Sequence, residues 1–185
     1  MKILTVSSGN FFTFIRPGVR EQGESLRLLG VDVDHFAING KGFIGYLKNV
    51  KKIKQQMQLK KYDILHGHYS LPAIASTLAG AKPLVVSLGG SDVQSNFAWR
   101  LIIKFFNYFF WDASIVKSKR LADILKLKNY HVIPNGVNLK RFNHIPKETA
   151  KTKVGFKKKK SIYYSSVTLG ERRKILNWPK RPLTY

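Results

Sequence analysis

Two histidines stand one residue apart in the segment YDILHGHY, which covers residues 62–69. Residues at this spacing in an extended strand project from the same face, so we expect the imidazoles of His66 and His68 to point the same way. Two imidazoles on one side could bind a metal ion, with Asp92 as a candidate third ligand. No third ligand of matching spacing is evident, so we predict no metal. Hydrogen bonding to a sugar or phosphate, or a structural role, remain as interpretations.

The segment LVVSLGGSDV at residues 84–93 places Gly89, Gly90 and Ser91 directly after a β-like run. Glycines let the backbone approach an anion, and several N–H groups can then converge on a phosphate. A tight turn needs the same residues, so both interpretations stay open. The chain contains neither a G-x-G-x-x-G nor a P-loop lysine pattern, which argues against nicotinamide cofactors and P-loop nucleotide hydrolysis.

Residues 96–111, NFAWRLIIKFFNYFFW, combine aromatic side chains with a polar stripe at helical spacing. The stripe consists of Asn96, Arg100, Lys104 and Asn107. A helix of this length reaches about 24 Å, too short to span a bilayer. We expect a helix buried between layers of the protein. The alternative is a helix lying in a membrane interface, anchored by Trp99, Tyr108 and Trp111.

The elements that position these residues are β-like runs that alternate with helical patterns along the chain. The β-like runs cover residues 2–7, 31–38, 63–66, 84–88, 113–116 and 131–133. Helical patterns lie between them at residues 20–29, 44–61, 71–79, 96–111 and 119–127. This alternation predicts an α/β fold with a Rossmann-like, doubly wound parallel sheet covered on both faces.

Ligand-binding loops of such a sheet gather at the carboxyl ends of its strands. Polar residues and glycines of this chain fall at those ends. They are Ser8, Gly9 and Asn10 after the first run, His66 and His68 at the third, Gly89, Gly90, Ser91 and Asp92 after the fourth, Ser118 after the fifth, and Asn135 and Gly136 after the last. We predict that these residues line the functional site.

The composition narrows the classes of partner. The chain has 185 residues, 44% of them hydrophobic, and a formal net charge of +23, so it can bury a core and attract anions. Nucleic acid, an anionic membrane face and phosphorylated small molecules all fit this charge. The absence of Cys excludes disulfides and thiolate metal sites. Without a long apolar stretch or a cleavable leader, we expect a cytoplasmic protein.

The run VIPNGVNLKRF at residues 132–142 joins a strand to a compact turn, in which Asn135 and Gly136 follow Pro134. It resembles the V-I-x-N-G-V-D-x-x-x-F element of family 4 retaining glycosyltransferases of the GT-B type. Residues 62–69, 84–93 and 112–118 (DASIVKS) agree with the family in order and spacing. The resemblance covers about residues 1–156 and identifies them as the N-terminal, acceptor-side domain, one half of a GT-B fold.

The resemblance implies two Rossmann-like domains that face a cleft, the first holding the acceptor and the second the nucleotide-sugar donor. It places Gly18, His68 and the loop from Gly89 to Asp92 on the acceptor side, and residues 135–137 near the crossing into the second domain. Many relatives carry, at the position of Gly89, a histidine thought to touch the transferred sugar, so this chain departs from the family there. No catalytic residue is assigned.

Residues 157–185 form a basic tail that does not continue the family pattern, and residues 141–185 hold 13 basic and 2 acidic side chains. The family's donor domain would begin near residue 160. An A-rich tract would encode the four lysines at 157–160, and a frame displaced by two nucleotides can read YLLFVSNPGREEKN, which resembles the entry into that domain. We therefore expect the tail to be disordered or the out-of-frame start of a missing donor domain.

The resemblance predicts a glycosyltransferase acceptor-binding domain. The intact parent would transfer a sugar, with retention, from a nucleotide-sugar donor to a glycan or lipid-linked acceptor. This chain would be truncated and inactive alone, and it would need no other cofactor. A noncatalytic sugar- or phosphate-binding module is the alternative.

The distribution of basic residues distinguishes between nucleic acid and a membrane as partners. A nucleic-acid-binding protein is a weaker alternative, because the basic residues are scattered and no reading helix or stacking platform is found; we expect no nucleic acid partner. The basic helix at 44–61 and the aromatic helix at 96–111 would suit docking on an anionic inner membrane face, which would make the protein peripheral there.

Overall fold

A computed structural model describes residues 1–10, 15–139, 144–153 and 155. The chain divides into two compact units, Met1–Arg141 and Phe142–Tyr185. The second unit contains α8 (Lys147–Lys153), in which Lys151 pairs with Glu148. The basic tail expected at residues 157–185 lies outside the described residues.

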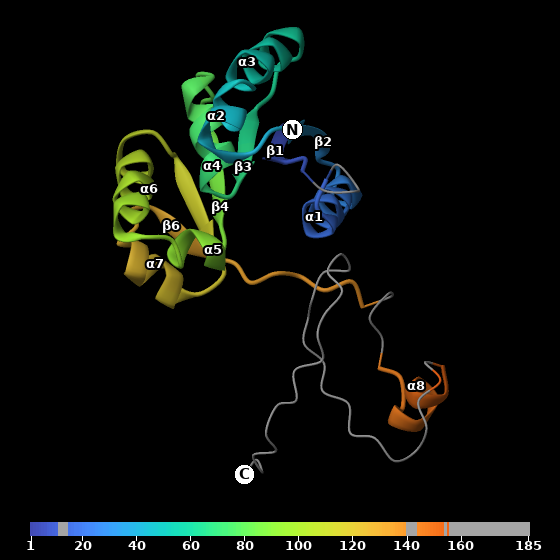
Figure 1. Ribbon diagram of the computed structural model, residues 1–185. Coiled ribbons are helices and arrows are strands. Elements are labelled where there is room, and N and C mark those ends of the chain that lie inside the picture. The colour runs from blue at the N-terminus through green and yellow to red at the C-terminus, as the bar shows by residue number, and fades with distance from the viewer. Residues whose placement is uncertain (11–14, 140–143, 154, 156–185) are drawn as a thin grey trace. The chain divides into compact units, whose positions relative to one another are not determined.

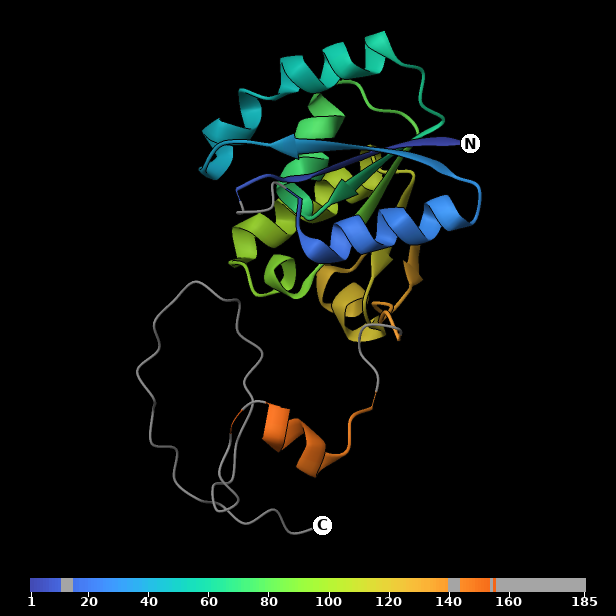
Figure 2. The same ribbon diagram turned by 90° about the vertical axis from the view of Figure 1, so that its right-hand side faces the viewer.

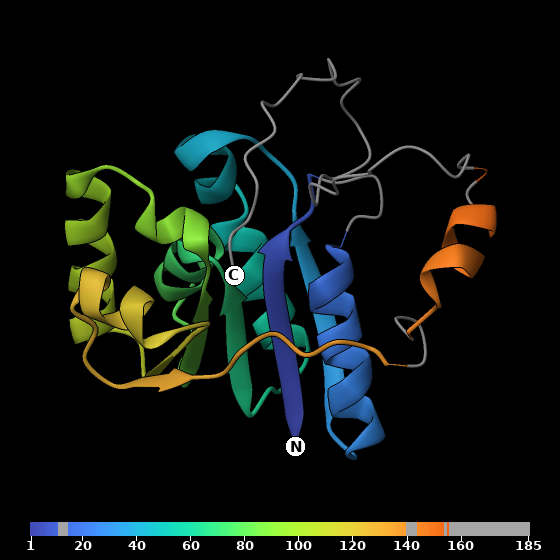
Figure 3. The same cartoon turned by 90° about the horizontal axis from the view of Figure 1, so that it is seen from below.

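Six parallel strands form one sheet in the first unit, in the order β2-β1-β3-β4-β5-β6. The strands are β1 (Lys2–Ser8), β2 (Asp32–Ile38), β3 (Ile64–His68), β4 (Leu84–Leu88), β5 (Ala113–Val116) and β6 (Tyr130–Val132). Each overlaps a predicted β-like run, and the predicted α/β, Rossmann-like parallel sheet is confirmed. Figure 3 shows β1 between β2 and β3.

Helices lie between consecutive strands, as predicted. They are α1 (Pro17–Leu28), α2 (Gly42–Leu47), α3 (Val50–Leu59), α4 (Ser70–Leu78), α5 (Gly90–Val93), α6 (Phe97–Phe109) and α7 (Lys119–Leu125) (Figure 1). α1 begins earlier than its pattern predicts, because Pro17 suits the first helical position, where an N–H is not needed. It buries Val19 and Gly23, while Leu29 directly after the helix is exposed.

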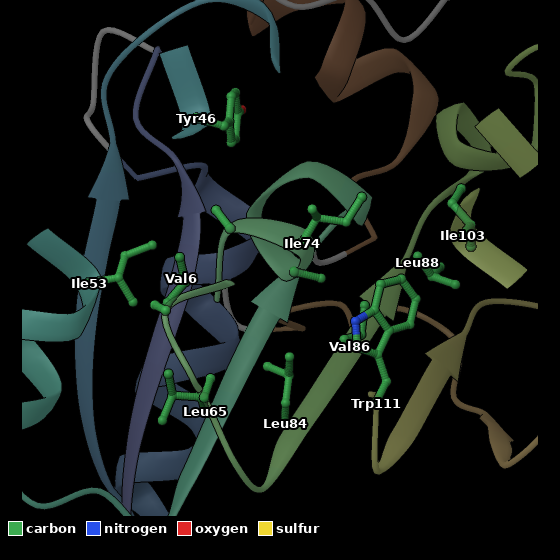
Figure 4. Close-up of a cluster of buried hydrophobic side chains, with 14 of the residues drawn as sticks. Val6, Tyr46, Ile53, Leu65, Ile74, Leu84, Val86, Leu88, Ile103 and Trp111 are labelled. Atoms are coloured by element: carbon green, nitrogen blue, oxygen red, sulfur yellow. The ribbon is translucent and has the colours of Figure 1, made fainter. Parts of the chain in front are cut away.

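One face of the sheet carries the hydrophobic core (Figure 4). Leu65 on β3 is in register with Leu4 and Leu84, and all three project to the same side because neighbouring positions of parallel strands share a face. The helices that close this side contribute Ile53 of α3, Ile74 of α4, Ile103 of α6 and Leu125 of α7. Each fully buried side chain of this size stabilises the fold by about 1.5–3 kcal/mol.

The opposite face of the sheet is packed by α1, which lies in front of the strands in Figure 2. His35 on β2 projects toward this helix, since a Cβ on Gly23 would lie 2.7 Å from the His35 ring. His66 and His68 project to the same face, because His66 and His35 are both in register with Thr5. The sheet thus has an apolar face and a face rich in histidine.

The basic helix predicted at residues 44–61 is two helices, α2 and α3, separated at Lys48 and Asn49. The buried side chain of Asn49 donates to the backbone oxygens of Gly45 at 2.7 Å and Asn39 at 2.9 Å. An asparagine that bonds nearby backbone competes with the helical hydrogen bonds, which explains the break. The lysines of α3 are exposed.

The predicted polar stripe of α6 is divided: Asn107 is buried and Arg100 half-buried, whereas Asn96 and Lys104 are exposed. Asn107 is 3% exposed; its amide donates to Ser114 Oγ at 2.9 Å and its oxygen accepts from the backbone N–H of Lys128 at 2.8 Å. The other side of α6 carries large apolar side chains that remain exposed, namely Phe97, Leu101, Ile102, Phe105, Tyr108 and Phe109. We call these six residues the outer stripe. The prediction of a helix buried between layers is therefore wrong for this side of α6.

Two of the three predicted membrane anchors are internal. The Trp111 indole is 5% exposed and donates to Thr77 Oγ1 at 3.2 Å, and the half-buried Trp99 indole donates to Ser70 Oγ at 3.1 Å. Tyr108 is exposed. None of the helices that the structure describes is long and apolar enough to cross a membrane.

Candidate functional site

A hollow of about 260 Å³ opens at the carboxyl ends of β1, β3 and β4. The strand order reverses between β1 and β3, and ligands of open α/β sheets bind at such a switch point. Ser8 ends β1, Tyr69 and Ser70 follow β3, and Ser91 and Asp92 follow β4. The lining is Ser8, Arg16, Tyr46, Tyr69, Ser70, Leu71, Pro72, Ser91, Asp92 and Trp99.

The Asp92 carboxylate holds two loops of the hollow together. One oxygen accepts from the backbone N–H of Ser70 at 3.1 Å and from its hydroxyl at 2.6 Å, and the other accepts from the backbone N–H of Gly89 at 2.8 Å. Ser70 is the first residue of α4 and Gly89 is the N-cap of α5, so the carboxylate lies at the positive ends of two helices. Asp92 is 5% exposed and three donors occupy its oxygens.

Trp99 extends this network to α6. Its indole N–H donates to Ser70 Oγ at 3.1 Å, and that hydroxyl in turn donates to Asp92. The Asn96 side chain caps α6 by accepting from the backbone N–H of Trp99 at 2.9 Å. The start of α6 is thereby fixed against the wall of the hollow.

Tyr69 and Arg16 form a second wall. The guanidinium of Arg16, the N-cap residue of α1, lies 4.7 Å from the centre of the Tyr69 ring, a cation–π distance. Tyr69 has φ of 72°, a left-handed conformation that is uncommon for a residue with a bulky side chain. A Cβ on Gly89 would lie 2.5 Å from Tyr69 Cε1, so the ring fills the space beside the glycine.

His66 and His68 point the same way, as predicted, with ring centres 4.3 Å apart. Both are buried on the sheet face that α1 packs, and neither lines the hollow. Burial, helped by the positive charge of Lys117, lowers the pKa of His66 to about 4. Burial, together with His66 and Lys117, also lowers the pKa of His68 far below its ordinary value. Both imidazoles are therefore neutral near pH 7.

His66 has a defined partner, because its Nε2 lies 2.9 Å from Ser87 Oγ. Gly67, between the two histidines, faces the other side, where a Cβ would lie 2.9 Å from the Cα of Ala73. Only glycine lets α4 approach β3 this closely. Among the described residues, no three His, Asp or Glu side chains are grouped so as to hold a metal ion.

The hollow is lined by few of the predicted site residues. Of the thirteen, Ser8, Ser91 and Asp92 line it. Gly9 and Asn10 join the ends of β1 and β2: the Gly9 N–H donates to Ile38 O at 2.8 Å, and the Asn10 amide exchanges two hydrogen bonds with Gly40. Those that do not line the hollow are Gly9, Asn10, Gly18, His66, His68, Gly89, Gly90, Ser118, Asn135 and Gly136.

Most residues that line the hollow were not predicted from the sequence. Tyr69 and Ser70 follow His68 directly, so the strand-end rule that selected His68 could have included them. No pattern in the sequence indicated Arg16 as a site residue, because the helical pattern begins only at Arg20. The remaining missed residues are Tyr46 of α2, Leu71 and Pro72 of α4, and Trp99 of α6.

The hollow is equipped to hold a polar ligand. Serine hydroxyls, a guanidinium and aromatic faces line it, and its volume is just below the roughly 300–1,000 Å³ of pockets for drug-sized ligands, which suits a group the size of one sugar. Asp92 is the one carboxyl group among its described lining residues, and its oxygens are already occupied. The arrangement can orient a hydroxyl group but offers no free carboxylate as a base.

Several solved structures share this fold. Sucrose-phosphate synthase from Thermosynechococcus elongatus aligns with a TM-score of 0.66 at 17% identity, over 84% of this chain and 53% of that one. A glycosyltransferase from Rickettsia africae aligns with a TM-score of 0.54 at 21% identity, over 85% of this chain and 50% of that one. Anabaena HepE, solved with UDP and glucose, aligns with a TM-score of 0.53 at 18% identity, over 84% of this chain and 50% of that one.

These neighbours are GT-B glycosyltransferases, and the chain spans about half the length of each. No curated protein matches the chain by sequence. The sequence profile of Glycosyltransferase Family 4 matches residues 9–141, which include the five strands β2 to β6 and begin directly after β1. With the profile covering most of its length and the fold agreeing, the chain belongs to Glycosyltransferase Family 4.

Proposed function

We propose that this chain is the acceptor-binding half of a glycosyltransferase that transfers a sugar, with retention, from a nucleotide-sugar donor to a glycan or lipid-linked acceptor. The acceptor would bind in the hollow at the ends of β1, β3 and β4. A second, donor-binding domain would complete the enzyme.

The observation that carries this proposal is the hollow itself. It lies at the switch point of the sheet in a family 4 chain, and its walls offer hydroxyls, aromatic faces and the Arg16 guanidinium. Transfer requires the acceptor hydroxyl to be held in line with the anomeric carbon, and rigid walls serve that purpose. The network from Trp99 through Ser70 to Asp92 makes one wall rigid.

A noncatalytic sugar-binding module is the second candidate. It is favoured by one observation, that the hollow's single described carboxylate is committed to backbone and hydroxyl donors. Holding an acceptor needs no base, whereas the departure of a nucleoside diphosphate needs groups that stabilise its charge. Such groups would belong to the donor-binding domain.

Binding is tested by saturation-transfer difference NMR with methyl glucoside, methyl mannoside, N-acetylglucosamine and UDP as probes. We expect signals from at least one sugar, weakened roughly tenfold by Arg16→Gln, which removes the charge from the wall. Arg20→Gln, on the exposed surface of the same helix, is the matched control and should bind as the wild type does. A signal from UDP without any from the sugars would assign the hollow to the donor and overturn the proposal.

Turnover is tested by incubating the 185-residue chain with UDP-glucose, UDP-N-acetylglucosamine or GDP-mannose and measuring nucleoside diphosphate release. We expect none with the chain alone. Release above the rate without protein would contradict the need for a second domain, while leaving acceptor binding in the hollow intact.

A further inference from the structure

The outer stripe of α6 is an apolar surface that the protein leaves uncovered. Its six side chains are between 38% and 70% exposed, and the adjoining Phe110 is 46% exposed. Single exposed apolar residues are ordinary in a soluble domain, but a contiguous group on one helix marks an interaction surface. Figure 1 shows α6 at the edge of the first unit, on the outside of the sheet.

The inner side of the same helix explains why this stripe stays outside. Ile103 and Phe106 pack in the core, and Asn107 holds Ser114 and the Lys128 backbone through two hydrogen bonds. Turning the helix to bury its aromatic side would leave those polar groups without partners inside the protein. The orientation of α6 is therefore fixed with the aromatic side outward.

Positive charge surrounds the stripe. Lys104 lies on the helix and is exposed, and the Lys128 ammonium is 4.5 Å from the centre of the exposed Tyr108 ring. Residues 96–111 contain no Asp or Glu, and residues 96–128 hold seven basic and two acidic side chains. An apolar helix face with a basic border is complementary to a lipid surface that carries negative charge.

We propose that the outer stripe docks on a membrane surface containing anionic lipid, with α6 lying in the plane of the interface. Trp99 on the inner side of α6 lines the hollow, so a docked helix holds the hollow beside the lipid headgroups. Resting on the proposed function, this assigns a lipid-borne acceptor to the hollow in place of a free glycan. The stripe supplies the attachment and the lysines supply the selectivity for anionic lipid.

The test is co-sedimentation of the full chain with vesicles of phosphatidylcholine, with and without phosphatidylglycerol. We expect binding to the anionic vesicles, weakened by raised salt, and a loss of roughly tenfold or more in the double variant Phe105→Ser, Phe109→Ser. The matched control is Leu28→Ser, Leu29→Ser, which removes two exposed leucines at the end of α1. This control should bind as the wild type does.

Three outcomes overturn the proposal. Equal binding to both vesicles would remove the anionic selectivity. Equal binding by wild type and stripe variant would assign the attraction to the scattered lysines, which both chains retain. A dimer in size-exclusion chromatography that dissociates in the stripe variant, without vesicle binding by either chain, would identify a second copy of the chain as the occupant.

Folding and sugar binding are measured separately. Circular dichroism melting of the stripe variant should match that of the wild type, because both replaced side chains are exposed. Sugar binding by NMR uses no vesicles, and vesicle binding uses no sugar. If no sugar binds, the vesicle experiment still tests membrane docking. If no vesicle binds, the NMR experiment still tests acceptor binding.

Discussion

The ring of Tyr69 occupies the space into which a side chain at residue 89 would project, because a Cβ on Gly89 would lie 2.5 Å from Tyr69 Cε1. The backbone of Gly89 is extended, with φ of −110°, so a larger residue there is opposed by this contact and not by backbone strain. The histidine that the family resemblance leads us to expect at this position is replaced by a glycine, and its volume is taken by the tyrosine.

Replacing Gly89 by His should therefore destabilise the fold by about 1–3 kcal/mol, the usual cost of overfilling a packed site. Urea unfolding followed by tryptophan fluorescence measures the loss. Tyr69→Gly should restore much of it, because glycine removes the ring and accepts the φ of 72° without strain.

Gly90→His is the control for this substitution, since nothing lies within 4 Å of a Cβ there. It should change the free energy of unfolding by no more than about 0.5 kcal/mol, as surface substitutions do. If both histidine variants lose the same stability, the proposed contact between residues 69 and 89 is wrong.

Asp92→Asn should cost about 1–3 kcal/mol of unfolding free energy. The amide can present its oxygen either to the donors of Ser70 or to that of Gly89, and its NH₂ group must then face another N–H. Asp123→Asn, exposed on α7, is the matched control and should melt with the wild type. Equal melting of both variants in circular dichroism would show that the carboxylate does not join α4 to α5.

The sheet could be predicted because each of its strands is specified by residues that are adjacent in the sequence. Each strand is a short run of β-branched and aliphatic residues, and alternation with helices leaves few arrangements. The strand-end rule also selected Ser8, Ser91 and Asp92, which line the hollow. It selected His66 and His68 as well, whose rings lie on a face of the sheet because side chains alternate between the two faces along a strand.

The orientation of α6 could not be predicted for a different reason. Periodicity locates a polar stripe and an apolar stripe, but it assigns the apolar one to the interior. Here the orientation is set by hydrogen bonds between Asn107 and two partners that lie outside the helix, the hydroxyl of Ser114 on β5 and the backbone N–H of Lys128 before β6. The break between α2 and α3 has a similar origin in the side chain of Asn49.

The neutral state of His66 should make stability depend on pH. Its pKa is about 4 in the folded chain and 6.5 in the unfolded chain, because burial disfavours the charged ring. The unfolded chain therefore binds the extra proton first as pH falls. The stability that depends on a neutral His66 is fully present above pH 6.5. As the pH falls to 4, the free energy of unfolding decreases progressively by on the order of 3 kcal/mol.

Urea unfolding at a series of pH values checks this expectation, with His66→Gln as the comparison. Glutamine can still reach Ser87 Oγ but does not titrate, so its stability should fall less between pH 6.5 and 4. Parallel pH profiles for the two proteins would mean that His66 does not carry the effect.

Asn107→Ala should destabilise the protein more than Phe105→Ser, although a rule based on hydrophobicity predicts the reverse. Loss of the amide leaves the Ser114 hydroxyl and the backbone N–H of Lys128 without this partner, at a cost of about 1–3 kcal/mol. Phe105 is 51% exposed, so its replacement should change stability by no more than about 0.5 kcal/mol. Chemical unfolding of both variants gives the order directly. A larger loss for Phe105→Ser would mean that the aromatic side of α6 is buried in solution, and the membrane-docking surface would then not exist.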